Sequence, residues 1–172
     1  VEVNVDFQGR LLVTDYDNNR VVRYGHPAAQ PDTSVHYGKK QKGVDVLYQP
    51  KKQILKINLK GKRNAEVRFE FKNTSTIAPD AFAISGPNYD KPAFNVKYFH
   101  NDIDVTTEIV AGTFMLKNIN PGATKTIVAK ISTKKKLVPI KAKRIQLNAY
   151  STISSDLTDS ATSIILRVKN SF

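Results

Sequence analysis

Apolar and polar residues alternate with a period of two along most of this chain, from residue 32 onward. The segment 55–59 reads Leu-Lys-Ile-Asn-Leu, and the segment 67–71 reads Val-Arg-Phe-Glu-Phe. Successive side chains of a β-strand point to opposite faces, so this pattern predicts strands with one buried face. The same pattern recurs in the segments 94–98, 127–131, 145–149 and 164–168. Helical periodicity is nearly absent, and we therefore expect an all-β protein.

Short polar segments separate these predicted strands. Groups rich in Gly, Pro, Asn and Ser occupy residues 60–62, 73–75, 85–88, 120–122 and 154–160. Many short strands joined by polar turns, without alternating helices, are typical of an antiparallel β-sandwich of immunoglobulin-like type. Five phenylalanines are expected to supply much of the core between its two sheets: Phe69, Phe71, Phe82, Phe94 and Phe99. We expect this sandwich to span residues 32–172.

The first 25 residues have a different organisation. Apolar alternation breaks at Gln8-Gly9, resumes at residue 10, breaks again over residues 15–19 and then returns. This predicts a three-strand β-meander with one tight turn and one polar loop. Residues 26–31, which contain two prolines, are expected to link the meander to the sandwich.

The meander resembles one unit of the NHL repeat, a β-propeller repeat of the form V-D-x-x-G-x-[LI]-[YV]-V-x-D-x-x-N-x-R-[VI]-x-x-[FY]. The matching residues are Val5, Asp6, Gly9, Leu11, Val13, Asp15, Asn18, Arg20, Val21 and Tyr24. A propeller needs at least about four blades, and the remaining sequence contains no second copy of the unit. The resemblance implies that this segment is one blade-like unit of a larger chain.

The segment 32–169 resembles a β-sandwich module of prokaryotic secreted and cell-surface proteins. The resemblance is carried by the order and spacing of short motifs, among them 65–73, 80–86, 94–99 and 119–122. The resemblance implies a structural or adhesive role outside the cell or at its surface, and the module has no known active site whose residues could be assigned here. This chain departs from the module in its many lysines.

Composition narrows these expectations further. The 172 residues contain no cysteine, which excludes disulfides and thiol catalysis. No window approaches the roughly 18 apolar residues that a membrane-spanning helix needs, so we expect no membrane insertion.

The formal net charge is +12, from 27 Lys and Arg against 15 Asp and Glu. Many lysines fall on alternate strand positions, which favours solvated sheet faces over a binding patch. A surface polyanion is the alternative partner, and the sequence offers one set of candidates for it: Lys134, Lys135, Lys136, Lys141, Lys143 and Arg144. Nucleic acid is not the expected partner, because no aromatic-rich stacking platform accompanies that set.

The sequence predicts neither an enzyme nor a cofactor. The three histidines have no acidic residue at a recognisable ligand spacing, and no hydrolase or phosphate-binding motif occurs. Asp15, Asp17 and Asn19 have the spacing with which a calcium loop begins, and they are weak calcium candidates. Arg20 stands where such a loop needs glycine, and His26 stands where it needs an acidic ligand.

Two further polar segments could carry a ligand or a modification. Asp156, Thr158 and Asp159 form a second oxygen-rich loop that could bind calcium. Asn73-Thr74-Ser75 is a formal N-glycosylation sequon at a predicted turn.

Three functional hypotheses follow. The first is a non-enzymatic structural or adhesive module on the surface of a prokaryote or secreted by it, as the C-terminal part of a larger chain. The second is a self-assembling subunit of a fibre or coat, because an exposed meander pairs with other sheets. Its strand-pairing candidates are Val1, Val3, Val5, Phe7, Leu11 and Val13. The third is a basic module that binds a polyanion.

Overall fold

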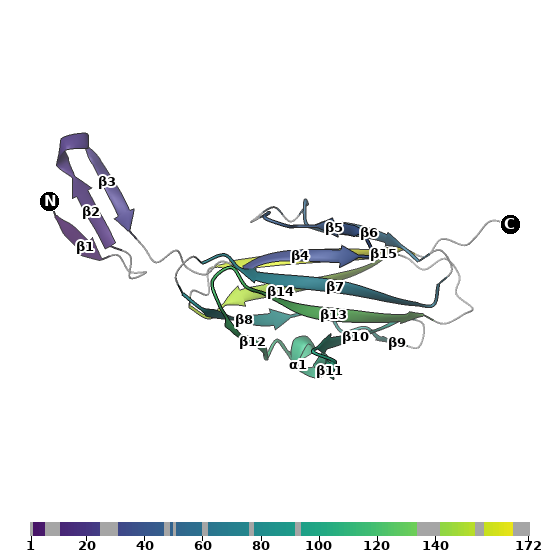
Figure 1. Ribbon diagram of the computed structural model, residues 1–172. Coiled ribbons are helices and arrows are strands. Elements are labelled where there is room, and N and C mark those ends of the chain that lie inside the picture. Colours follow the sequence, from purple (N-terminus) through teal and green to yellow (C-terminus); the bar gives the residue numbers. More distant parts are fainter. Residues whose placement is uncertain are drawn as a thin grey trace.

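The protein is all-β, with two packed sheets and a separate small sheet at its N-terminal end (Figure 1). The computed structural model describes residues 2–5, 11–24, 31–46, 49, 51–59, 62–75, 78–91, 94–133, 142–153 and 157–166. The predicted immunoglobulin-like β-sandwich with an N-terminal three-strand meander is confirmed. The predicted turn at Gln8-Gly9 and the predicted linker up to residue 30 lie outside the described residues.

One sheet of the sandwich has seven strands. They are β4 (Pro31–Tyr37), β5 (Lys40–Lys42), β7 (Asn64–Asn73), β9 (Asp90–Lys91), β10 (Phe94–His100), β11 (Ile103–Asp104) and β13 (Thr124–Thr133). Their order is β11-β10-β13-β7-β4-β5, and β9 pairs with β10 beside β11. The short strands β5, β9 and β11 therefore lie at the two outer edges of this sheet.

The second sheet has five strands in the order β12-β8-β14-β15-β6. They are β6 (Ile54–Asn58), β8 (Asp80–Ser85), β12 (Phe114–Ile119), β14 (Lys143–Ser151) and β15 (Thr158–Leu166). All pairs are antiparallel except β15 with β6, which run parallel. One short helix, α1 (Thr106–Ala111), connects β11 of the first sheet to β12 of the second.

The N-terminal sheet contains β1 (Val3–Val5), β2 (Leu11–Asp15) and β3 (Arg20–Tyr24) in the order β1-β2-β3. A single 3₁₀ turn, Tyr16–Asn18, joins β2 to β3. Asn19 follows this turn with φ +48°, a left-handed conformation that Asn tolerates better than most residues. The polar loop of the NHL-like segment thus coincides with the tight turn between β2 and β3.

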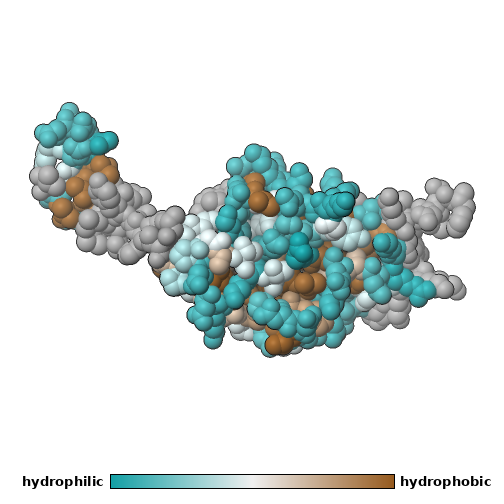
Figure 2. All heavy atoms as spheres, viewed as in Figure 1, coloured by the Kyte–Doolittle hydropathy of each residue, from teal (hydrophilic) through white to brown (hydrophobic). Residues whose placement is uncertain are grey.

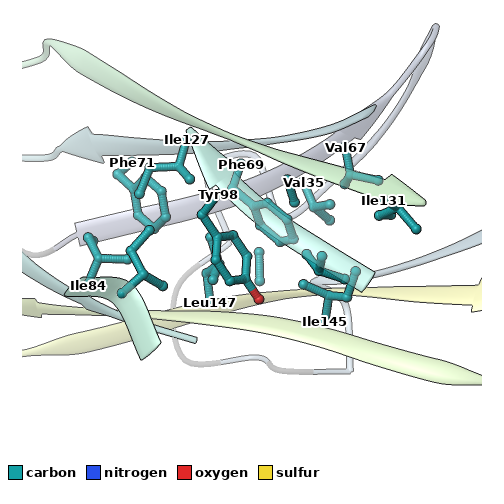
Figure 3. Close-up of a cluster of buried hydrophobic side chains, with 14 of the residues drawn as sticks. Val35, Val67, Phe69, Phe71, Ile84, Tyr98, Ile127, Ile131, Ile145 and Leu147 are labelled. Carbon is teal, nitrogen blue, oxygen red and sulfur yellow. The ribbon is translucent and has the colours of Figure 1, made fainter. Parts of the chain in front are cut away.

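The core lies between the two large sheets, as the period-two pattern predicts. Phe71 and Ile84 face each other across the gap between the sheets, and Tyr98 extends into the same interior (Figure 3). Phe69, Phe71, Phe82 and Phe94 are all buried. Burial of an aromatic side chain of this size contributes about 1.5 to 3 kcal/mol.

Phe99 is an exception, and its predicted place in the core is wrong. Tyr98 is fully buried, and its neighbour in β10 therefore points to the opposite face of the sheet. There the Lys130 ammonium lies 4.4 Å from the centroid of the Phe99 ring. The ring shields the stem of a surface lysine instead of filling the interior.

Candidate interaction surfaces

The register of the N-terminal sheet collects apolar residues on one face. Val3, Val13 and Val22 occupy one row across the three strands, and Val5, Leu11 and Tyr24 occupy the next. Rows two residues apart belong to the same face of a sheet. Four of the six strand-pairing candidates, Val3, Val5, Leu11 and Val13, thus come together, while Val1 and Phe7 lie outside the described residues.

The large apolar side chains of this small sheet are unusually exposed. On this face Val3 is 54% exposed, whereas the described core residues of the sandwich are below 9%. Val21 on the opposite face and Tyr16 in the turn between β2 and β3 are also exposed. Hydrophobic residues gather visibly on the N-terminal sheet in Figure 2. An apolar sheet face leaves water only when it packs against another element. This face is therefore the most prominent candidate docking surface on the chain.

The loop that carries the weak calcium candidates is held by its own side chains. The Asp15 carboxylate accepts hydrogen bonds from Asn18 Nδ2 at 3.0 and 3.1 Å and from Arg20 Nε at 2.8 Å. The Arg20 guanidinium lowers the pKa of this carboxyl below its ordinary value. Asp17 and Asn19 are exposed on the same loop. Arg20 thus supplies the positive charge that a cation would otherwise bring to Asp15.

A polar cluster lies inside one end of the sandwich and joins its two sheets. Asp159, at the start of β15, accepts hydrogen bonds from Gln53 Nε2 and from the backbone N–H of Thr33 in β4, each at 2.7 Å. Burial raises the pKa of the Asp159 carboxyl above its ordinary value. Asp159 of the oxygen-rich loop that was expected to be able to bind calcium is 7% exposed, and its carboxylate is engaged by Gln53 and Thr33. Asp156 of the same loop lies outside the described residues.

Asp32 is the second buried acid near this end of the sandwich. Its Oδ2 atom accepts a hydrogen bond from the backbone N–H of Asp45 at 2.9 Å. Desolvation raises the pKa of the Asp32 carboxyl, and the nearby charge of Asp45 raises it further. Oδ1 has no hydrogen-bond partner within the part of the chain that the structure describes. Both buried acids thus carry a desolvation cost that the sequence pattern does not reveal.

Asn73, the asparagine of the formal glycosylation sequon, has a structural role. Asn73 is fully buried, and its Nδ2 atom donates to the carbonyls of Ile119 at 2.8 Å and Ala78 at 3.0 Å. Its Oδ1 atom accepts from the backbone N–H of Ser75 at 2.8 Å. Both hydrogens of the amide are therefore committed to the interior. The folded protein offers no amide to a glycan at this position, so the expected turn-exposed site is wrong.

Many charges on the outer face of the seven-stranded sheet are matched in pairs. Lys72 Nζ lies 3.0 Å from Asp45, Lys97 Nζ lies 3.0 Å from Asp104, and Arg68 Nε lies 3.0 Å from Glu70. Lys130 Nζ is 4.0 Å from Glu66. These four positive charges are therefore balanced locally, and they do not account for the excess of lysine over acid.

The edge strands β5 and β6 carry part of the excess of lysine over acidic residues. Strand β5 ends the seven-stranded sheet, β6 ends the five-stranded sheet, and the two strands lie against each other on the same side of the sandwich (Figure 1). We call this side the basic edge and define it by six exposed lysines: Lys39, Lys40, Lys42, Lys51, Lys52 and Lys56. Sequence analysis missed this set, because residues on two strands of different sheets do not form a run.

The opposite edge of the seven-stranded sheet is acidic. Strands β9 and β11 and helix α1 border a cavity of about 600 Å³ along β10. Its lining includes the carboxylates of Asp90, Asp104 and Glu108, with Lys97 as the one described cation among the lining residues. Lys97 and Thr106 both donate to Asp104 and lower the pKa of its carboxyl. The two edges of the seven-stranded sheet thus carry net charges of opposite sign.

The predicted polyanion patch is described only in part. Lys134, Lys135, Lys136 and Lys141 lie outside the described residues, and Lys143 and Arg144 open β14. The Arg144 carbonyl accepts a hydrogen bond from the Tyr89 hydroxyl at 2.7 Å, and Lys143 Nζ lies 5.8 Å from the centroid of the Tyr89 ring. Arg144 pairs with Ile164 of β15, and Ile164 pairs with Lys56 of β6, so the described part of the patch lies two strands from Lys56 of the basic edge.

The described side chains do not assemble a recognisable catalytic or metal centre. His36 Nε2 lies 2.8 Å from the Ser34 hydroxyl and 3.2 Å from Glu70, and His100 Nδ1 lies 2.8 Å from the Thr126 carbonyl. Within the described ranges, no three His, Cys, Asp or Glu side chains come together as a metal ion would require. Nor do those ranges contain a helix long and apolar enough to cross a membrane.

No protein-family model matches the chain, and no curated protein matches it. Among solved structures, the chain is similar to the VesB protease of Vibrio cholerae, with 9% identity and a TM-score of 0.40 over 93% of this chain and 41% of that one. It is also similar to zebrafish RET cadherin-like domains 1 to 4, with 9% identity and a TM-score of 0.40 over 92% of this chain and 32% of that one.

The chain thus spans about two fifths and one third of the lengths of these two structures. Similarity this low carries no information on function. The assignment to an immunoglobulin-like all-β fold rests on the chain's own two sheets and core.

Proposed function

We propose that this protein is a non-enzymatic structural or adhesive module of a prokaryotic cell-surface or secreted protein. In this proposal the sandwich is a rigid spacer, and the N-terminal sheet docks onto further β-sheet of a larger chain. The observation that carries the proposal is the apolar face of the N-terminal sheet, on which Val3 is 54% exposed. Packing a second sheet on that face would remove its apolar area from water.

The NHL-like spacing of residues 5–24 supports a blade of a propeller as the docking partner. In a propeller, neighbouring blades cover each other's faces, so that each sheet needs its neighbours. Val3, Val13 and Val22 supply an apolar face that one such neighbouring blade would cover. The sandwich provides its own core from residues 35–165, and its stability does not require that contact.

A self-assembling subunit is the second candidate, and the same exposed face favours it. A second copy of the chain could cover the face in place of a blade. Two copies that use the same surface would form a closed dimer, whereas use of two different surfaces would build an open fibre.

The test measures the solution mass of the whole chain by light scattering across concentrations, together with the fluorescence of a dye that binds exposed apolar surface. A monomer that binds the dye supports docking onto a missing part of a larger chain. A mass that rises with concentration supports the self-assembling subunit instead. A monomer without dye binding contradicts both, because it would mean that the face is already covered.

A further inference from the structure

The six lysines of the basic edge form a positive surface that ion pairing leaves unbalanced. Residues 39–59 contain these six lysines and one acidic residue, Asp45. Asp45 is engaged by Lys72 at 3.0 Å, outside the basic edge. None of the six lysines takes part in an ion pair within the part of the chain that the structure describes. Their charges are available to an external anion.

The two edge strands spread these charges over the basic edge. Lys40 and Lys42 are two residues apart on β5, so they belong to the same face, roughly 7 Å apart along the strand. Lys56 lies on β6, the neighbouring edge of the other sheet, and Lys51 and Lys52 precede that strand. Positive charges spread over two strands match an extended polymer of negative charges better than a compact anion.

Charge on the rest of the seven-stranded sheet favours binding at this edge over binding at its outer face or its far edge. The outer face of the seven-stranded sheet is balanced by ion pairs such as Lys97 with Asp104. The far edge presents Asp90, Asp104 and Glu108, which would repel an anion. The described residues of the basic edge include neither an arginine nor an exposed aromatic ring on which bases could stack.

We propose that the basic edge, formed by β5, β6 and the turns before them, binds an acidic polysaccharide. The ammonium groups of its lysines would pair with the carboxylate or sulfate groups of the polymer and release its condensed counterions. This binding site is independent of the N-terminal sheet, and it would hold the module on an anionic surface polymer while the sheet docks elsewhere.

The test measures the affinity of the whole chain for heparin as a function of salt concentration. Removing one ammonium group that pairs with the polymer should reduce the slope of log affinity against log salt by about 0.7 to 0.9. The double variant Lys40→Gln with Lys42→Gln should therefore reduce the slope by about 1.4 to 1.8. Two controls remove the same charge: Lys97→Gln with Lys130→Gln in the middle of the seven-stranded sheet, and Lys143→Gln with Arg144→Gln on β14, two strands from Lys56. Circular dichroism confirms the fold of each variant.

The proposal requires that the slope fall much more in the β5 variant than in either control. An equal decrease in all three variants would overturn it, because binding would then follow net charge and not a site. A larger decrease in the variant of Lys143 and Arg144 would place the site at β14 instead and would also overturn it. So would tighter binding of duplex DNA than of heparin at equal salt, or no heparin binding at low salt. None of these results depends on how the N-terminal sheet associates.

Discussion

The carboxylate of Asp159 accepts a hydrogen bond from the backbone N–H of Thr33 at 2.7 Å, although the two residues are 126 positions apart and lie in different sheets. Gln53 donates to the same carboxylate and lies 3.4 Å from the Thr33 carbonyl. A side chain of one sheet thus satisfies the backbone of the other where β5 no longer pairs with β4. This contact closes one end of the sandwich.

The pKa of Asp159 gives this contact a pH dependence. Burial raises the pKa of the carboxyl above its ordinary 3.8, so the native state holds the proton to higher pH than the unfolded state does. The unfolding free energy should therefore fall as pH rises from 3.8 through the raised pKa, and level off above it. The variant Asp159→Asn lacks this titration.

Urea unfolding of the wild type and of Asp159→Asn, from about pH 3 to about pH 7, measures the effect. The stability of the wild type relative to the variant should decrease over this range. A relative stability that instead increases with pH would mean that the carboxylate is better solvated or paired in the native state than its burial indicates.

Asn73 should be one of the most sensitive polar positions in the sandwich. Asn73→Ala leaves the carbonyls of Ile119 and Ala78 and the N–H of Ser75 without this partner, at a cost of about 2 to 3 kcal/mol. Asn95→Ala, which removes an exposed hydrogen bond to Asp90, is the matched control and should cost less than about 0.5 kcal/mol. Chemical unfolding of both variants checks the difference, and equal costs would refute it.

Gly86 is required because two elements approach its backbone closely. A Cβ atom at this position would lie 2.4 Å from Leu147 Cδ2 and 3.1 Å from Ile109 Cγ2. Gly86→Ala should therefore lower the unfolding free energy by about 1 to 3 kcal/mol. The destabilisation should be smaller in a Leu147→Val background, because valine lacks the clashing Cδ2 methyl group. A destabilisation that is the same in both backgrounds would point to backbone entropy instead of packing.

The period-two pattern predicted the sandwich well because burial of one strand face is a local property of sequence. In β7, Val67, Phe69 and Phe71 are buried and the residues between them are exposed or half-buried. The expectation from residue type failed for Phe99, since the neighbour of the buried Tyr98 in a strand must face outward whatever its hydrophobicity. Periodicity decides between neighbouring residues, and residue type alone does not.

Features that depend on distant partners could not be predicted. Asn73 and Asp159 have the composition of exposed turns, and only the contacts with Ile119 and Thr33 bring them into the interior. Helix α1 is too short, at six residues, to show helical periodicity. The basic edge joins Lys42 of one sheet to Lys56 of the other, a proximity that only the packing of the two sheets creates.

Replacing Val3 by lysine and, separately, Val21 by lysine compares the two faces of the N-terminal sheet directly. The two valines are 54% and 60% exposed and lie on opposite faces, so both variants add the same charge at a similarly open position. Val3→Lys should abolish the apolar dye binding or the association of the whole chain, and Val21→Lys should leave it unchanged. If both substitutions have the same effect, or if neither has any, the apolar face formed by Val3, Val13 and Val22 is not a docking surface.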